Sequence, residues 1–446
     1  MQLVLVPEDI FIAFGMFLSF GDVFSLRLCG SKHLYELSLS RTFWSAWIHE
    51  NIVRVGLWSP ERFLGLLGLP QTELERLALR TVCIWHDQHK LPTLHPKRLT
   101  RIRYDGGIIS WVTLHAGRWA FLASSGGHLE LWDILALHRY NVALDLKGGW
   151  VYSGLVHATK DVDKHLLVLS SSLQKSYLVQ CVLDKNPAFI PLRIYEGLSK
   201  PLAASGNLVL FADSTTPQTA VLASSEGVMC SLSLLVHDTA PQLAQSAVFC
   251  ESNVFIFKSS AVCVYEHDMI SDPSVYVAPN LCINPKHIIE LKSRLFQIQP
   301  WVGENLNHPT IHLVARDEGE NFLLLQLKAH EDTGLMTLSR PTEEVPIRSV
   351  PLACRNLAMT SSCKACVFST EDERHQTSTI VSCMLEGDRI GRPRILWQLP
   401  SSINWSAGVH LLAFDDVIGM MAVGTVEPGQ GNMWLVDFGG GFSVFH

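Results

Sequence analysis

The stretch from Trp119 to Ile134 reads WAFLASSGGHLELWDI and indicates the fold of most of the chain. Its first part, WAFLA, is a short apolar run with the composition of a buried strand. A Ser-Gly-Gly turn follows, and a second strand then ends in Trp132-Asp133. Two short strands joined by a glycine-containing turn predict a β-hairpin of an antiparallel sheet.

Short strand-like runs of the same kind recur from about residue 101 onward, separated by turn residues every ~8–12 positions. No long amphipathic helical pattern interrupts them. The clearest runs are Trp119–Ala123, Leu166–Leu169, Leu208–Phe211, Val254–Phe257, Thr310–Val314 and Phe322–Leu325. This spacing is typical of an all-β sandwich, barrel or propeller.

The hairpin resembles one blade of a WD-repeat propeller, in which small antiparallel sheets repeat around a central axis. Weaker copies of the pattern are Trp150–Leu169, Ala220–Leu235, Val248–Val264 and Gly419–Asp437. Seven blades in residues 98–446 would have about 50 residues each and six blades about 58, against roughly 40–45 in a typical repeat. We therefore expect seven blades with loop insertions. Six blades, or a pair of two-sheet sandwiches, are the alternatives.

Composition and charge narrow the class of protein. The 446 residues are 48% hydrophobic and 17% charged, below the roughly 25% charged residues of an ordinary soluble domain. A net charge of −7 provides no basic field for nucleic acid. The 11 cysteines follow no spacing rule, which favours reduced thiols in the cytoplasm or nucleus.

The N-terminal part of the chain predicts a series of short helices. Pro7 suits the first turn of a helix, and apolar residues then recur at helical spacing up to Leu18. Gly15 lies inside this helix and should weaken it by about 1 kcal/mol. Ser19 and Asp22 have the spacing of a capping box before a second helix from Asp22 to Cys29, and Gly30 ends that helix.

The apolar run from Ile10 to Phe20 is not expected to be a signal peptide or a membrane span. It lacks a basic region before it, and acidic residues flank it on both sides. It also has about half of the roughly 20 residues that cross a bilayer. The sequence therefore predicts a soluble, non-secreted protein with no membrane contact.

Several N-terminal residues together resemble the F-box domain. They are Val6-Pro7-Glu8-Asp9-Ile10, Leu18, Asp22–Leu28, Ser31-Lys32 and Trp44. The similarity covers about residues 5–48, and with the β region it resembles the fungal F-box proteins that carry a propeller-like C-terminal domain. It implies a substrate receptor of an SCF-type cullin–RING ubiquitin ligase. The partners would be a Skp-type adaptor, through it a cullin, and a substrate protein on the propeller.

The resemblance also implies which residues would contact the adaptor. By position they are Pro7, Ile10, Phe14, Leu18, Val23 and Leu26. Core packing is an equally good explanation for any single one of them, and Phe11 is a further residue that could serve either purpose. A unit of ~40 residues cannot bury all of its apolar surface, which fits docking on a partner.

We thus expect a multidomain chain with an F-box-like helical domain at residues 1–50, a helical linker region at 51–97 and a propeller at 98–446. Within the linker region, Ser59-Pro60-Glu61 predicts a helix start, and Gly68 would stop that helix. Thr72–Glu75 has the pattern of a capping box for a helix to about His89. We predict that Leu91–Thr100 form the boundary segment that links these helices to the propeller.

Motifs for catalysis, cofactors or metals are incomplete. His49-Glu50 begins a zinc-protease pattern, but Val53 occupies the position of the second histidine. The Cys363–Cys366 pair has no fourth ligand at zinc spacing, so a structural pair of strand cysteines is the better interpretation. We predict a non-enzyme without cofactor or metal.

Two rival interpretations of the propeller remain at this point. It could be a stable scaffold without ubiquitin transfer, or a hydrolase or lyase with channel residues such as Asp145 or His157. A phosphorylated ligand would require a basic pocket. The arginines available for one are Arg101, Arg103, Arg355, Arg392 and Arg394.

Overall fold

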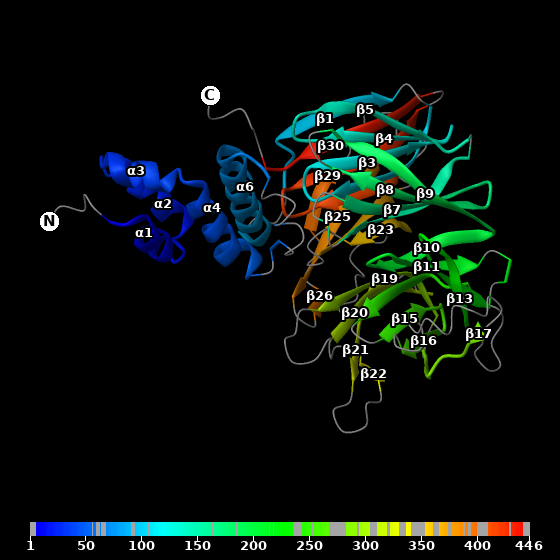
Figure 1. Ribbon diagram of the computed structural model, residues 1–446. Helices are drawn as coiled ribbons and strands as arrows, with labels where there is room; N and C mark the ends of the chain where they lie inside the picture. The colour runs from blue at the N-terminus through cyan, green and yellow to red at the C-terminus, as the bar shows by residue number, and fades with distance from the viewer. Residues whose placement is uncertain are drawn as a thin grey trace.

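The computed structural model places a group of helices beside a ring of β-sheets (Figure 1). It describes residues 6–55, 57–58, 63, 68–90, 94–104, 107–147, 149–159, 161, 164–183, 186–213, 215–216, 218–234, 243–250, 253–266, 282–291, 294–303, 310–318, 322–329, 336–339, 353–359, 365–372, 377–386, 389–390, 394–398, 409–427 and 430–439.

The helical region contains several short helices, three of them capped by serine, and the longer helix α6. They are α1 (Glu8–Gly15), α2 (Phe20–Leu28), α3 (Lys32–Ser38), α4 (Arg41–Ile48), the π-helix η2 (His49–Val53) and α6 (Gln71–Lys90). Ser19, Ser31 and Ser40 are the N-caps of α2, α3 and α4, and each hydroxyl accepts a hydrogen bond from an amide three residues on. Such caps satisfy amides that have no partner inside the helix.

The predicted capping box at Ser19 is confirmed. The Ser19 hydroxyl accepts from the Asp22 amide at 3.3 Å, and the Asp22 carboxylate accepts from the Ser19 amide at 3.1 Å. The helix itself begins at Phe20 rather than at Asp22. Gly30 adopts a φ of 75° just beyond α2, as expected for a residue that ends a helix.

The predicted capping box at Thr72 is wrong, because α6 already begins at Gln71 and places Thr72 inside the helix. The carbonyl of Pro70 accepts the amides of Glu73 and Leu74, which fixes the start of the first turn. Of the helix predicted after Ser59, most residues lie outside the described part of the chain.

Seven sheets follow, and each is one blade of a propeller. Blade A contains β2 (Ile109–His115), β3 (Trp119–Ser124), β4 (His128–Asp133) and β5 (His138–Asp145). Blade B contains β6 (Val151–Ala158), β7 (Lys164–Ser171), β8 (Lys175–Val182) and β9 (Ala188–Glu196). Blade C contains β10 (Leu198–Ser205), β11 (Leu208–Asp213), β12 (Thr219–Ser224), β13 (Gly227–Ser233) and the parallel β17 (Cys282–Ile283).

The remaining four blades complete the ring. Blade D contains β14 (Ser246–Cys250), β15 (Asn253–Phe257), β16 (Ala261–Glu266) and β18 (His287–Glu290). Blade E contains β19 (Leu295–Gly303), β20 (Thr310–Asp317), β21 (Phe322–Ala329) and β22 (Met336–Ser339). Blade F contains β23 (Ala353–Met359), β24 (Ala365–Asp372), β25 (Thr377–Glu386), β26 (Arg389–Ile390) and β27 (Arg394–Gln398). Blade G contains β28 (Val409–Asp415), β29 (Met420–Glu427), β30 (Gln430–Asp437) and β1 (Arg98–Tyr104).

The ring closes by joining the two ends of the β region. The first strands of the blades are neighbours in the order β2, β6, β10, β14, β19, β23, β28 and back to β2. In blade G the outermost strand is β1, which pairs antiparallel with β30 from Arg98 opposite Asp437 to Tyr104 opposite Gly431. An early strand of the chain therefore completes its last blade.

The expected seven-bladed propeller is confirmed. The hairpin predicted from Trp119 to Ile134 is β3 and β4, and all six of the clearest predicted runs lie within strands. The predicted linker Leu91–Thr100 is too long, because β1 already begins at Arg98.

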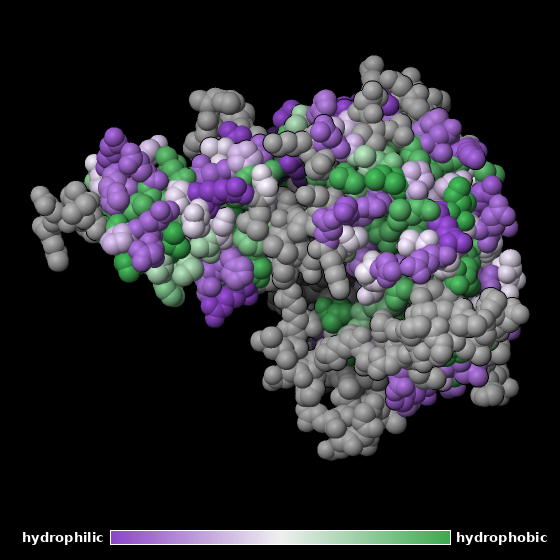
Figure 2. Space-filling view, in the orientation of Figure 1, coloured by the Kyte–Doolittle hydropathy of each residue, from purple (hydrophilic) through white to green (hydrophobic). Residues whose placement is uncertain are grey.

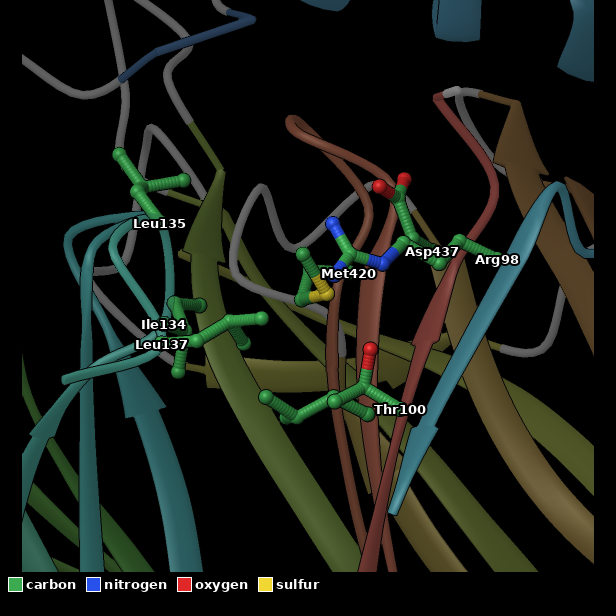
Figure 3. A pocket seen from close by; sticks show the side chains of 8 residues that line it. Arg98, Thr100, Ile134, Leu135, Leu137, Met420 and Asp437 are labelled. Atoms are coloured by element: carbon green, nitrogen blue, oxygen red, sulfur yellow. The ribbon is translucent and has the colours of Figure 1, made fainter. Parts of the chain in front are cut away.

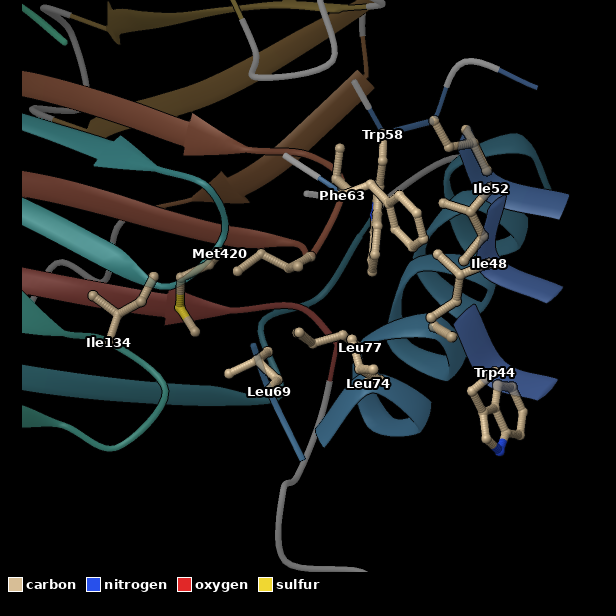
Figure 4. Close-up of a cluster of buried hydrophobic side chains, with 14 of the residues drawn as sticks. Trp44, Ile48, Ile52, Trp58, Phe63, Leu69, Leu74, Leu77, Ile134 and Met420 are labelled. Atoms are coloured by element: carbon tan, nitrogen blue, oxygen red, sulfur yellow. The ribbon is translucent and has the colours of Figure 1, made fainter. Parts of the chain in front are cut away.

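The helices and the propeller share one hydrophobic core. Trp44, Ile48, Ile52, Trp58, Leu74 and Leu77 cluster with side chains of blades A and G such as Ile134 and Met420 (Figure 4). The indole of Trp58 donates to the Thr81 hydroxyl at 3.0 Å, so this buried tryptophan also has a polar partner. Helices and ring are consequently packed together rather than joined only by a linker.

Candidate partner-binding surface

Helix α1 has one buried face and one exposed face. Phe11 and Gly15 are buried, and the Phe11 ring lies 5.2 Å from that of Phe43. Ile10, Phe14 and Phe17 have 55%, 57% and 82% of their surface exposed. Their spacing places them along one side of the helix and its end. Large apolar side chains so exposed are candidates for a protein contact.

The exposed side of α1 depends on how closely the helix packs on α4. A methyl group at Gly15 would overlap the ring of Phe43, so alanine does not fit at this position. The sequence placed Gly15 inside a helix that it would weaken, but in the structure α1 ends at Gly15. Glycine at this position lets α1 approach the ring of Phe43 closely. This packing fixes the direction in which Ile10 and Phe14 face.

The six residues predicted to contact an adaptor lie in different environments. Pro7, Ile10 and Phe14 are exposed. Leu18 and Leu26 are partly buried and pack against the shared core. Val23 has no exposed surface, so in this structure it is a core residue that supports α2. The structure therefore brings Ile10 and Phe14 together on the surface and separates Val23 from them.

Phe17 and Leu28 are the most exposed of the described large apolar residues that were not among the predicted contacts. Phe17 extends the α1 stripe, and Leu28 is 86% exposed at the end of α2. The helical spacing already included Phe17, whereas nothing in the sequence distinguishes Leu28 from the buried residues of α2. Figure 2 shows apolar surface on the helical region around α1, between polar patches.

A polar interaction holds this helical unit against α6. The Arg27 guanidinium donates to both carboxylate oxygens of Glu75, at 2.5 and 3.0 Å, and to the Ser38 hydroxyl at 2.9 Å. The side chains of Arg27 and Glu75 are only 11% and 15% exposed. A bidentate pair of this kind fixes geometry as well as contributing energy, so α2 is positioned firmly on α6.

The propeller has an exposed aromatic cluster of its own. Trp150 and Tyr152 are 48% and 40% exposed, with ring centroids 6.2 Å apart. Leu173, at 50% exposure, lies in the turn between β7 and β8, where the Ser172 amide donates to the Trp150 carbonyl at 2.9 Å. The cluster lies at the start of β6, the first strand of its blade. Helix α6 packs on the turn after β28, which is the end of the first strand of blade G. The cluster and α6 therefore lie at opposite ends of the first strands.

The two residues considered for a catalytic channel are not placed to act together. Asp145 ends β5, the outermost strand of its blade, and accepts the Lys147 amide at 2.8 Å. His157 lies on the innermost strand β6, where its Nε2 accepts from the Gly206 amide at 3.1 Å. Within the described ranges no group of three or more metal-ligating side chains is found.

Of the five arginines considered for a basic pocket, only the side chain of Arg101 lies in the described part of the chain. Arg101 donates to the Asn432 side chain at 2.9 Å and lies over the Trp434 ring. Arg392 is outside the described part of the chain, as are the side chains of Arg103, Arg355 and Arg394. Cys363 is outside it too, while Cys366 and Cys383 are buried opposite each other on β24 and β25.

Two buried thiols of the propeller, those of Cys230 and Cys263, are poor nucleophiles and metal ligands. Desolvation by burial raises the pKa of Cys263 to about 11. Burial, together with the nearby Cys282, raises the pKa of Cys230 to about 11. Both thiols are therefore protonated at neutral pH, whereas metal binding and nucleophilic attack require the thiolate.

A small cavity lies where blade G meets the turn after β4 (Figure 3). It is lined by Arg98, Thr100, Ile134, Leu135, Leu137, Met420, Leu435 and Asp437. Its volume of about 20 Å³ is room for roughly one water molecule. Drug-sized ligands need roughly 300–1,000 Å³, so this cavity is no substrate pocket.

Comparison with solved structures identifies the class of fold. The chain is similar to the β-propeller domain of Cps50 (Swd1) from Myceliophteria thermophila, with a TM-score of 0.50 and 10% sequence identity. The match covers 75% of this chain and 98% of that domain. The chain thus has a WD40-like β-propeller fold with seven blades, preceded by a small helical region.

Comparison by sequence adds no family. No protein-family model matches the chain, and no curated protein matches it. In the described part of the chain, no helix combines the length and the apolarity needed to cross a bilayer.

Proposed function

We propose that the protein is the F-box substrate receptor of an SCF-type cullin–RING ubiquitin ligase. In this proposal the helices bind a Skp-type adaptor and through it a cullin, and the propeller binds the substrate protein. The observation that carries the proposal is the exposed apolar stripe Ile10–Phe14–Phe17 on a helical unit that resembles the F-box in sequence.

The packing of the chain supports this use of the stripe. The buried side of the helical unit is fully occupied by the shared core and by the Arg27–Glu75 pair. The exposed side of α1 is therefore free to contact another protein without loosening the propeller. Ile10 and Phe14 are its proposed central contacts and Pro7, Leu18 and Leu26 are further proposed contacts, whereas Val23 has no exposed surface and supports α2 from within.

The test is co-expression of the full chain with a Skp-type adaptor and measurement of the affinity. We expect a stable complex for the wild type and a loss of at least about tenfold for Phe14→Asp and for Ile10→Asp, because a charge would be buried in an apolar contact. Leu173→Asp is the matched control, since Leu173 is equally exposed but lies on the propeller. The proposal fails if the intact chain forms no complex, or if Phe14→Asp binds like the Leu173→Asp control.

A protein-interaction scaffold without ubiquitin transfer is the second candidate. The exposed cluster of Trp150, Tyr152 and Leu173 favours it, because a protein-binding face on the propeller is useful with or without a ligase. The lifetimes of propeller-bound proteins separate the two functions. Longer lifetimes in cells that carry the Ile10→Asp/Phe14→Asp chain support the receptor, and unchanged lifetimes support the scaffold.

A further inference from the structure

In two blades the third strand ends in an aspartate. Each aspartate pairs with an arginine, but the two arginines come from different parts of the fold. In blade A, Asp133 ends β4 and accepts from Nε of Arg118 at 2.9 Å. Arg118 belongs to the turn between the first two strands of the same blade. The other oxygen of Asp133 accepts the amides of Leu135 and Ala136, both at 3.0 Å. Blade A thus satisfies its aspartate internally.

In blade G, Asp437 occupies the equivalent position at the end of β30. The backbone pairing shows the equivalence, because the residue after each aspartate donates to the turn between the first two strands. Ile134 donates to the Arg118 carbonyl at 2.8 Å, and Phe438 donates to the Gly419 carbonyl at 2.9 Å. Gly419 therefore stands where blade A has Arg118, and no basic residue occurs from Asp415 to Gly419.

The guanidinium that is missing from this turn of blade G comes from helix α6. Arg80 contacts both carboxylate oxygens of Asp437 through its terminal nitrogens and donates from Nε to the Ile418 carbonyl in the same turn. The side chains of Arg80 and Asp437 are only 5% and 8% exposed. Charges this deeply buried are stable only when paired and hydrogen-bonded.

The backbone of blade G is shaped to receive this helix. Gly419 has a φ of 61°, and a methyl group there would overlap the side chain of Ile84 on α6. At Gly439 a methyl group would come within 2.7 Å of the Arg80 Nε. Glycine at both positions lets α6 approach the end of the blade closely.

The same place is the closure of the ring. Asp437 lies opposite Arg98 in the pairing of β30 with β1, and its carbonyl accepts the Lys97 amide at 2.7 Å. Helix α6 precedes β1 in the chain, so one segment supplies both the closing strand and the arginine that holds the end of its partner strand.

From these contacts we infer that Arg80 locks the closure of the propeller by supplying to Asp437 the guanidinium that Arg118 supplies within blade A. Helix α6 is in this sense part of the propeller, and the domain boundary lies before α6 rather than at residue 98. A partner that pulled α6 away would open the pairing of β1 with β30. The inference does not depend on which partner the helices bind.

The test compares amide hydrogen exchange of the full chain in three forms: wild type, Arg80→Met and Arg118→Met. Methionine keeps much of the length of the arginine side chain while removing its charge. For Arg80→Met we expect exchange to be at least tenfold faster in β1 and β30 and unchanged in blade B. For Arg118→Met we expect the acceleration only in β3 and β4. Unchanged protection of β1 and β30 in Arg80→Met, or an equal increase in all blades, would overturn the inference.

A second pair of variants covers the case in which Arg80→Met does not fold. Arg80→Lys keeps the charge but loses the planar fork that reaches both oxygens, so we expect a smaller acceleration confined to β1 and β30. If Arg80 acts through Asp437, adding Asp437→Asn to Arg80→Lys should accelerate exchange by less than the product of the two single effects. Independent effects of the two substitutions would contradict the proposed lock.

Discussion

The buried side and the exposed side of the helical region both carry large apolar residues but differ in burial. On the buried side, Trp44 and Trp47 are 0% and 2% exposed. On the face formed by α1, Ile10 and Phe14 are more than half exposed. A small helical unit has too little volume to bury both faces. The buried residues stabilise the fold, whereas the exposed residues are free to contact a partner. Substitutions on each side test this assignment.

The largest effect should come from the buried face, at Trp44. Its ring packs against Phe20, Phe43 and Trp47, and its indole donates to the Ser38 carbonyl at 3.0 Å. Trp44→Ala should lower the free energy of unfolding by about 3–5 kcal/mol, as for other large-to-small core changes. Exchange of the α2 and α4 amides measures it locally. A loss below about 1 kcal/mol would mean that the buried side contributes less to the free energy of unfolding than its burial indicates.

The next effect concerns the polar contact between α2 and α6. Arg27→Met removes the charged partner of a nearly buried Glu75, which keeps its hydrogen bond from Gln71, and should destabilise the helical region by about 3 kcal/mol. Lys32→Met is the control, because the Lys32–Glu36 pair is exposed, with 3.7 Å between Nζ and Oε1, and such pairs contribute about 0–1 kcal/mol. Equal effects in urea unfolding of the two variants would show that Arg27 does not hold α2 to α6.

An intermediate effect is expected where the two faces meet, at Gly15. Helix propensity alone predicts that Gly15→Ala stabilises α1, by at most about 1 kcal/mol because Gly15 is the last residue of the helix. The overlap with Phe43 should reverse the sign and destabilise by about 1–2 kcal/mol, since overpacking a core is costly. Phe43→Leu should remove part of that penalty in the double variant. Stabilisation by Gly15→Ala alone, in thermal unfolding, would refute the close packing.

The sequence predicted those features that rest on local patterns. The Ser19 capping box, the strands of the propeller and their grouping into seven blades follow from residue spacing over a few positions. The start of α6 was missed because Pro70 offers a carbonyl to two amides, which outweighs the Thr72 pattern. Contacts between distant residues leave no local pattern. The Arg80–Asp437 pair joins positions 357 residues apart, and the burial of Val23 depends on α2 packing into the shared core.

The smallest effect should come from the exposed face, and α1 provides a matched pair to show it. Phe11 and Phe14 are one turn apart on the same helix, yet their exposures are 3% and 57%. Phe11→Ser should cost about 3–5 kcal/mol, because it removes a buried ring and leaves a hydroxyl in the core. Phe14→Ser should change the free energy of unfolding by less than about 0.5 kcal/mol, as is usual for surface positions. Urea unfolding followed by circular dichroism measures both. A large loss for Phe14→Ser would place Phe14 in the core of the free chain and remove it from the proposed binding surface, whereas a stable variant would allow any loss of partner binding to be assigned to the contact itself.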